Sequence, residues 1–438
     1  MADYLARNDS PSVVDSRVTI DDVTIGELVR QYGSPLFVFS ERAIRRRFRQ
    51  MHDAFTCRYA NTQFAWSYKT NYLSAICSLM HQQGAIAEIV SVLEYQKTKS
   101  LGVPGDQIIF NGPNKPLDTL GSAVADGVFV NIDHIGEVHD LEMIAKKTRR
   151  TIDVGIRLNM DVGQETNWAR FGFNLENGEA LAAAKRICQS GSLRITGLHC
   201  HIGTSVVNVD AYQKATQNLV QFGYQVRDKF GTPFNRIDIG GGFASSCPVK
   251  QTSTSISTPT DDQYAKAICD QLARTLDSNH QPELIIESGR ALIDDAGYLI
   301  TTVLANKRLP DGTAACVIDA GVNLLHTAST HRLKAEAEFP NQNSETPTTL
   351  FGPLCMHTDV VAEKVDLPPL DRGQHIVVSP VGAYNNSLWT QFIEYRPNVV
   401  VICHDGSIEL IREREDLSDI QNRERLPDRF KAPYESCP

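Results

Sequence analysis

Short apolar runs alternate with amphipathic segments between residues 60 and 290, and this alternation constrains the fold of the 438-residue chain most strongly. The apolar runs occupy 63–69, 85–91, 107–112, 127–132, 153–159, 195–203, 236–243 and 283–289. Nearly continuous apolar runs of this length are typical of strands buried on both faces of a parallel sheet. The intervening segments carry apolar residues at helical spacing, as at Tyr212, Leu219 and Val226. Eight strand–helix units predict a closed (β/α)8 TIM barrel, of the α/β class, rather than an open, doubly wound sheet.

The pattern changes after residue 295, where strand-like runs follow one another without long helices. This texture predicts a second, C-terminal domain that is mainly antiparallel β. We expect the barrel to span 36–295, and 1–35 to join 296–438 in the β domain. Two stretches rich in Ser, Thr and Pro are expected to be loops, at 245–262 and 337–347. The composition of the first makes it a candidate lid.

Charge and composition argue against several classes of protein. The net charge is −9 and the pI about 5.8, whereas nucleic-acid binders carry clustered basic residues. The closest basic run, Arg45 to Arg47, reads as the polar face of a helix. The polar N-terminus does not resemble a secretory signal, and no apolar run approaches the length of a membrane span. The ten cysteines form no CxxC pair. We therefore expect a cytoplasmic enzyme without a metal site, without nucleic-acid partners and without membrane attachment.

In a barrel of this kind the active site lies at the C-terminal ends of the strands. The polar residues that the sequence places there are Lys69, Ser91, Asn111, Arg157, His201, the glycines 240 to 242, Glu287 and Arg290. Lys69 ends an apolar run, where a lysine either reaches for solvent or, when desolvated, acts as a catalytic amine. His199 and His201 point the same way on a strand and could bind a metal, stack on an aromatic cofactor or simply be hydrogen-bonded.

The remaining motifs have a functional and a plain interpretation each. Consecutive glycines from Gly240 let backbone N–H groups converge on an anion, and the absence of the GxGxxG pattern favours one phosphate over a pyrophosphate. Glu287 and Arg290 form either an ion pair at the barrel rim or a cofactor contact, since a carboxylate can keep a ring nitrogen protonated. Cys355 is either an inert core residue or reactive, and the Tyr384 hydroxyl either packs or reaches a phosphate.

In this order and at these strand ends, the motifs resemble those of the fold type III, alanine-racemase-like decarboxylases that use pyridoxal 5′-phosphate (PLP). This group includes diaminopimelate and ornithine decarboxylases, and the resemblance covers about residues 36–400. It implies a bound PLP, an amino-acid substrate and removal of the substrate's α-carboxylate. It also implies a homodimer in which the β domain contributes to the active site and to the dimer interface.

The resemblance assigns roles to single positions. Lys69 in SYKTN looks like the Schiff-base lysine, His201 like the imidazole stacked on the pyridine ring, and Glu287 like the partner of the ring nitrogen. Cys355 looks like the residue donated across the dimer interface, and would return a proton after CO2 leaves. The other positions that match the cofactor-binding set are Glu88, Ser91, Arg157, Thr204, Gly240, Gly241, Gly242, Gly289, Arg290 and Tyr384.

The expected substrate-binding positions are Arg290, Thr327, Met356, His357 and Asp359. Diaminopimelate decarboxylases typically carry Glu after the cysteine, where this chain has Met356, and Arg-Pro where it has Thr327-Ala328. Without that carboxylate and guanidinium, a charged distal end loses its paired recognition. The departures favour an amino-acid conjugate, such as a citryl-diamino acid of siderophore biosynthesis. The alternatives are diaminopimelate, D-ornithine or D-lysine decarboxylation. Racemisation is disfavoured by the Cys355 motif, and a small PLP-binding regulatory protein would lack the β domain.

Overall fold

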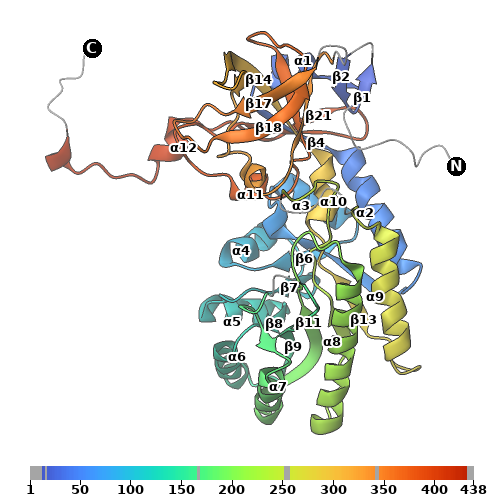
Figure 1. Cartoon of the computed structure of the whole chain (residues 1–438). Coiled ribbons are helices and arrows are strands. Elements are labelled where there is room, and N and C mark those ends of the chain that lie inside the picture. The colour runs from blue at the N-terminus through green and yellow to red at the C-terminus, as the bar shows by residue number, and fades with distance from the viewer. Residues whose placement is uncertain (1–11, 15–16, 165–167, 251–256, 341–344, 432–438) are drawn as a thin grey trace.

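A computed structural model of the chain describes residues 12–14, 17–164, 168–250, 257–340 and 345–431. It shows two domains, with a layer of helices around a sheet in the lower half of Figure 1 and a mainly β domain above it. Among the described residues, no helix is long and apolar enough to cross a membrane. Parts of the two stretches expected to be loops, 251–256 and 341–344, lie outside the described residues.

The lower domain is a closed parallel barrel, which confirms the predicted fold. Its strands are β5 (Thr62–Ser67), β6 (Ile86–Ile89), β7 (Ile108–Phe110), β8 (Phe129–Ile132), β9 (Ile152–Asn159), β11 (Leu193–Cys200), β12 (Arg236–Asp238) and β13 (Glu283–Ile286). Each strand pairs in parallel with the next, and the barrel closes where Leu284 of β13 faces Thr62 of β5. The two-residue strand β10 (Phe173–Asn174) extends the sheet beside β9.

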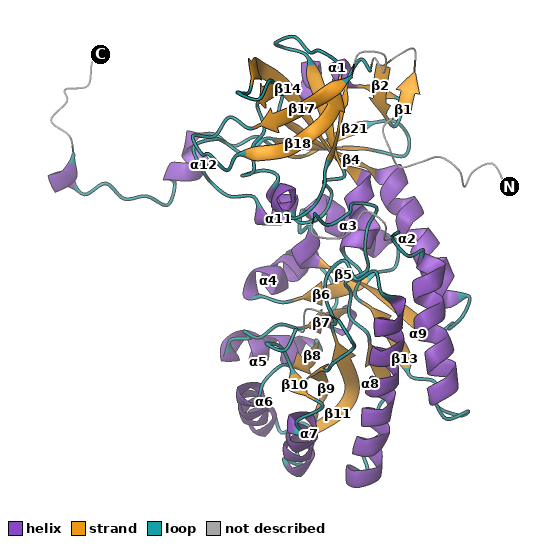
Figure 2. Ribbon diagram, viewed as in Figure 1, coloured by secondary structure: helices purple, strands orange, loops and turns teal. Residues whose placement is uncertain are grey.

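Helices cover the outside of the barrel, as Figure 2 shows. They are α2 (Glu41–Thr56), α3 (Ser74–Gln82), α4 (Val92–Ser100), α5 (Leu117–Asp126), α6 (Ile135–Thr148), α7 (Glu179–Gln189), α8 (Val209–Phe230), α9 (Asp261–Thr275) and the short α10 (Arg290–Ile293). The 3-10 turns η1 (Tyr68–Thr70), η2 (Gly105–Gln107) and η3 (Asp294–Ala296) join them to strands. The predicted stripe of α8 is buried at Tyr212, Leu219 and Val226, so the helix packs by its apolar face.

The β domain is built on a long curved strand, β14 (Gly297–Arg308). Its other strands are β4 (Leu36–Ser40), β15 (Ala314–Ile318), β16 (Lys334–Ala337), β17 (Thr346–Phe351), β18 (Val360–Leu367), β19 (His375–Ser379), β20 (Asn398–Ile402) and β21 (Ile408–Arg412). Most pairs are antiparallel, and β15–β17 and β4–β20 are parallel. The barrel was expected to begin at residue 36, whereas β4 pairs with β14 and β20 of this second sheet.

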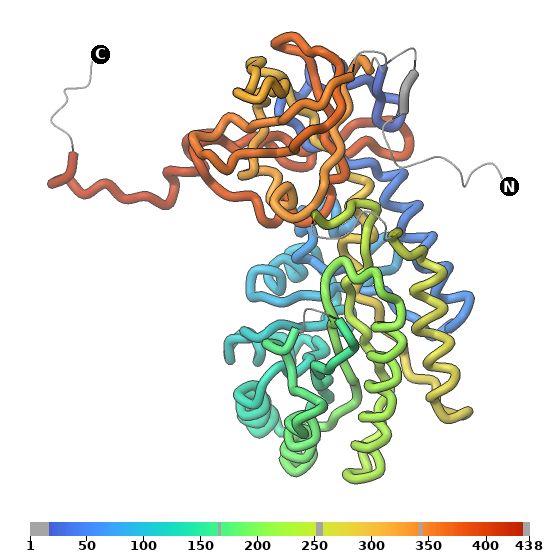
Figure 3. Tube along the Cα trace, in the orientation of Figure 1, coloured from blue at the N-terminus to red at the C-terminus, as the bar shows by residue number. Residues whose placement is uncertain are grey.

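The N-terminal segment packs on the β domain. The small strands β1 (Ser12–Val14), β2 (Arg17–Ile20) and β3 (Val23–Thr24) form one sheet, followed by helix α1 (Ile25–Tyr32). Ile20 and Leu28 share a buried cluster with Val377 and Val400. The domain also carries η4 (His326–Ser329) and α11 (Asn385–Leu388). In Figure 3 the chain after β21, with α12 (Leu417–Gln421) and η6 (Asp428–Phe430), extends away from this domain.

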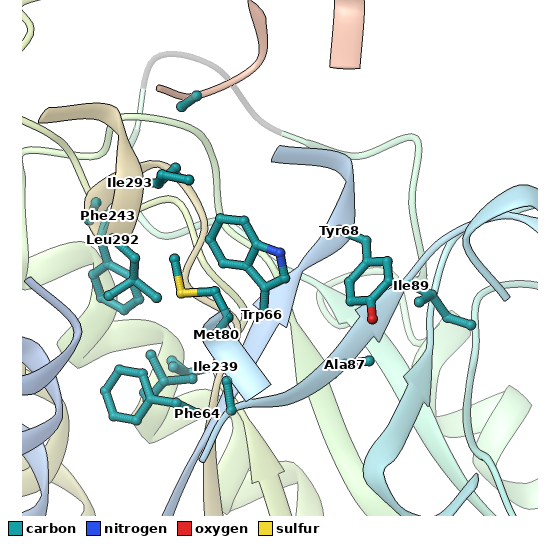
Figure 4. Close-up of a cluster of buried hydrophobic side chains, with 14 of the residues drawn as sticks. Phe64, Trp66, Tyr68, Met80, Ala87, Ile89, Ile239, Phe243, Leu292 and Ile293 are labelled. Carbon is teal, nitrogen blue, oxygen red and sulfur yellow. The ribbon is translucent and has the colours of Figure 1, made fainter. Parts of the chain in front are cut away.

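A buried apolar cluster supports the turn that carries Lys69. Phe64, Trp66 and Tyr68 come from β5 and the turn after it and are at most 1% exposed. Figure 4 shows Trp66 beside Met80 and the Leu292–Ile293 pair, with Tyr68 facing Ile89. Because a close-packed interior resists displacement, this cluster holds the turn, and with it Lys69, in a fixed position.

Candidate active site

Lys69 lies directly after β5, at the C-terminal end of the barrel. Its Nζ donates a hydrogen bond to Oε2 of Glu88 at 2.5 Å, and the Ser67 hydroxyl donates to the same oxygen at 2.5 Å. Burial lowers the pKa of Lys69, but the negative charges of Glu88 and Glu287 raise this pKa by more than burial lowers it. The net shift is therefore upward. Lys69 must therefore lose a proton before its amine can act as a nucleophile, and Glu88 is positioned to receive it.

Glu287 follows β13 and lies in a buried polar cluster with His199 and Asp238. One nitrogen or carboxylate oxygen from each of these three side chains lies within 4.8 Å of the corresponding atoms of the other two. Glu287 Oε2 is 3.4 Å from His199 Nε2. Burial raises the pKa of Glu287, yet His199 and Lys69 lower it more, whereas burial and the Glu287 charge both raise the pKa of Asp238. Asp238 therefore holds the proton and Glu287 is the ionised carboxylate, able to stabilise a protonated ring nitrogen.

His201 follows β11 and is held in one tautomer. Its Nδ1 accepts a hydrogen bond from the backbone N–H of Gly241 at 3.1 Å, so any ring proton resides on Nε2. Its ring centroid lies 5.2 Å from that of Trp168. Burial, with Lys69 and Arg157, lowers the pKa of His201 to about 3. A neutral, immobilised imidazole at this place can pack against an aromatic cofactor.

The glycine run after β12 forms a cradle that a side chain would fill. Gly240 and Gly242 have φ of 69° and 88°, and a Cβ on Gly240 would lie 2.4 Å from the Cys200 carbonyl oxygen. Ser205 Oγ, in the loop after β11, and Arg290 Nε, at the start of α10, are buried without a hydrogen-bond partner among the described residues. A free hydroxyl and a free guanidinium N–H beside a stretch of backbone without side chains are what a phosphate requires.

Asp294 joins the cradle to the β domain. It accepts hydrogen bonds from Arg290 Nη1 at 3.1 Å, from Ser245 Oγ at 2.6 Å and from the Ala383 N–H at 3.2 Å. Tyr384, at φ 62°, then lies with its ring 4.9 Å from the Arg290 guanidinium. A residue of the second domain is thus brought to the rim of the barrel.

Four further residues expected to contact the cofactor also lie at or beside the barrel end. Arg157 pairs with Asp133 at 3.4 Å and stacks on the Phe171 ring. Ser91 is the N-cap of α4, where its hydroxyl accepts from the Glu94 N–H. Thr204 is exposed. Gly289 is required by packing, since a Cβ there would lie 2.1 Å from Thr70 Oγ1.

The expected substrate-side residues fall into two groups. Cys355, Met356 and His357 are exposed on the β17–β18 loop of the β domain. Asp359 and Thr327 are buried and bonded within their own chain. Both Asp359 oxygens accept backbone N–H groups, from Val322 and Leu354, and the Thr327 hydroxyl donates to Asn385 Oδ1. The Asp359 and Thr327 side chains therefore stabilise loops of their own chain through these hydrogen bonds.

Four residues of the site carry no predicted role, although Asn111 was expected at a strand end: Asn111, Asn131, Asp294 and Trp168. Their significance depends on contacts between distant strands and loops, for which a single amide, carboxyl or indole gives no pattern.

Comparison with known proteins identifies the family of the chain. Residues 41–294 match the family model described as "Pyridoxal-dependent decarboxylase, pyridoxal binding domain", and the chain belongs to this family. The chain is 28% identical to the diaminopimelate decarboxylase of Methanocaldococcus jannaschii over 96% of this chain and 98% of that one. It is 27% identical to that of Bacillus subtilis over 90% and 92%.

Solved structures of decarboxylases have the same fold. The crystal structure of the M. jannaschii diaminopimelate decarboxylase has a TM-score of 0.89 at 27% identity, covering 97% of this chain and 99% of that chain. The Helicobacter pylori diaminopimelate decarboxylase complexed with L-lysine has a TM-score of 0.79 at 25% identity, covering 91% and 98%. The chain is thus a PLP-dependent carboxy-lyase that acts on an amino acid.

The residues present fit PLP. The glycine cradle with Ser205 and Arg290 would take the phosphate, Glu287 the ring nitrogen, and Lys69 the aldehyde carbon. When bound, PLP supplies an electron sink for the pair left behind when the α-carboxylate departs. The chain itself would place His201 beside the ring, keeps Glu287 ionised and provides Glu88 beside the Lys69 amine.

Proposed function

We propose that this chain decarboxylates diaminopimelate, with Lys69, His201 and Cys355 as catalytic residues. The observation that carries the proposal is the end-to-end similarity to diaminopimelate decarboxylases, which covers both domains rather than the barrel alone. This similarity favours diaminopimelate, an alternative in the sequence analysis, over the conjugated substrate preferred there.

A second candidate is a diamino acid whose distal end is uncharged or conjugated. It is favoured by Thr327, which is buried and whose hydroxyl donates a hydrogen bond to Asn385. Thr327 occupies the position at which diaminopimelate decarboxylases typically carry an arginine, whose guanidinium would bind a distal carboxylate. Met356, 41% exposed, adds an apolar thioether directly after Cys355. Neither side chain offers the charge that a zwitterionic distal end would need.

The two candidates are separated by measuring CO2 release from the PLP-loaded enzyme. The panel is meso-diaminopimelate, L- and D-ornithine, L- and D-lysine, and a citryl-diamino acid, with Lys69→Ala as the inactive control. Diaminopimelate should give the highest kcat/KM. Turnover of the conjugate alone would refute the proposal and support the second candidate.

We also propose that two chains form a homodimer in which each supplies Cys355 to its partner's site. Cys355 is exposed on the β domain, and Met356, Phe392 and Ile393 are exposed apolar side chains of the same domain. Mixing inactive Lys69→Ala with inactive Cys355→Ala chains tests this arrangement. Shared sites predict that subunit exchange restores activity, because mixed dimers contain one intact site. No recovery after verified exchange would refute it.

A further inference from the structure

An amide side chain lies between the two carboxylates of the active site, and the functions described so far do not use it. Asn111 directly follows β7 and is 2% exposed. Its Nδ2 donates one hydrogen bond to Glu88 Oε1 at 3.1 Å and another to Glu287 Oε1 at 2.5 Å. Both hydrogens of the amide nitrogen are therefore used, one in the hydrogen bond to Glu88 and one in the hydrogen bond to Glu287.

The orientation of this amide is fixed by the next two strands. Asn131 of β8 is also 2% exposed and donates its Nδ2 to Asn111 Oδ1 at 2.8 Å, so the NH2 group of Asn111 faces the carboxylates. Gly155 of β9 is the register partner of Asn131, and a Cβ on Gly155 would lie 1.7 Å from Asn131 Oδ1. The glycine makes room for Asn131, and three adjacent strands together set the amide.

The chemistry of the two carboxylates explains why a neutral donor is suitable here. An ionised carboxylate only accepts hydrogen bonds, and a buried one is costly unless donors surround it. A lysine or arginine at this position would add a positive charge that competes for Glu287. An aspartate would add a third acceptor and force one carboxyl group to take up a proton.

We propose that Asn111, oriented by Asn131, is a positioning residue that ties Glu88 to Glu287 and keeps Glu287 directed at the ring nitrogen of bound PLP. The inference rests on the family's PLP chemistry and on the roles assigned here to Glu88 and Glu287. It does not depend on which amino acid is decarboxylated.

The test measures bound PLP before any substrate is added. The visible absorbance band of the PLP-loaded protein is titrated with pH, and the PLP dissociation constant is measured by dialysis. The charged and titratable groups that interact with the two carboxylates, all retained in the variants, are Lys69, Glu94, His199, Cys200, His201 and Asp238. Asn111→Asp should move the band's titration midpoint upward by about one unit or more, because a nearby negative charge favours the protonated form.

Asn159→Asp is the matched control. Asn159 is likewise a barrel strand-end asparagine, but its Nδ2 donates to backbone carbonyls, including those of Phe171 and Gly172. This variant should lose thermal stability without moving the band. Asn131→Ala leaves both carboxylates untouched and should weaken PLP binding several-fold, since Asn111 is then free to turn.

An Asn111→Asp protein that is folded and titrates like the wild type would overturn the proposal. If Asn111→Asp does not fold, Asn131→Ala decides: wild-type PLP affinity and an unmoved band would leave Asn111 a purely structural residue. Because each readout precedes turnover, failure here is distinguishable from a wrong choice of substrate.

Discussion

Replacing Gly240 by alanine should lower both the Tm and the PLP affinity of the protein. The same replacement at a second glycine, Gly231, provides the reference for these losses. Gly240 has φ of 69°, and the new Cβ would lie 2.4 Å from the Cys200 carbonyl oxygen and 3.0 Å from the His201 Cα. Gly231, at the C-terminal end of α8, has almost the same φ of 70°, but no atom lies within 4 Å of its added Cβ. The pair separates backbone strain from close approach.

The magnitudes follow from the two geometries. Holding an alanine in the left-handed region costs roughly 1–2 kcal/mol, which both variants share. Only Gly240→Ala must also displace packed backbone, and overpacking of this kind typically costs about 1–3 kcal/mol more. For a domain of barrel size, 1 kcal/mol corresponds to roughly 2–4 °C in Tm. Gly240→Ala should therefore melt at least about 2 °C below Gly231→Ala.

Thermal unfolding of both apoproteins measures the difference, and PLP titration shows whether the loss reaches the site. Gly231→Ala should bind PLP as the wild type does, because Gly231 precedes β12 whereas the cradle follows it, and the added Cβ has no atom within 4 Å. Gly240→Ala should bind PLP at least tenfold more weakly, since the displaced backbone also carries the N–H of Gly241 that orients His201. Equal Tm and equal PLP affinity in the two variants would refute the close packing of this loop.

Three further outcomes follow from the site. His201 has a folded pKa of about 3, below its unfolded value, so the unfolded state binds the extra proton as pH falls from about 6.5. The decline of Tm between pH 7 and pH 4 should therefore be shallower in His201→Gln, and an unchanged slope would contradict this. Burial and Glu88 raise the pKa of Glu94 to about 7, so its stabilising contribution is full below pH 4.5 and is lost as pH rises through 7. Glu94→Gln should raise Tm at pH 8 and leave it nearly unchanged at pH 4, as differential scanning calorimetry at both values would show. Cys355→Ala should keep the visible band of bound PLP but lower kcat at least tenfold; undiminished CO2 release would exclude Cys355 as the proton donor.

The sequence predicts the barrel well because its strands are buried on both faces and therefore stand out as apolar runs. The same signal misplaces β4, since LFVFS (36–40) is fully buried too, and only its pairing with β14 and β20 shows to which sheet it belongs. Such pairings join residues hundreds of positions apart and leave no local pattern.

The site residues show the same limit at the level of single side chains. Motif position anticipated that Lys69 and Glu287 lie at the barrel end. It could not show that Asp359 uses both its oxygens on backbone N–H groups of its own loops. Nor could it single out Asn111, because the amide acquires its role only where β6 and β13 bring Glu88 and Glu287 within reach of it.

One tight turn gives the site opposite charges at its two ends. Glu287 and Arg290 are separated by two residues, and the Glu287 N–H donates to the Gly240 carbonyl at 2.9 Å, which fastens the turn to the phosphate cradle. Gly289 lets the chain pass against Thr70, in the turn that carries Lys69. A ligand with an anionic group and a protonated ring nitrogen can pair with Arg290 and Glu287 in one direction only. In the opposite direction its phosphate would lie against the Glu287 carboxylate. The turn after β13 would therefore set the end-to-end direction of PLP in the site, with the phosphate toward Arg290 and the ring nitrogen toward Glu287.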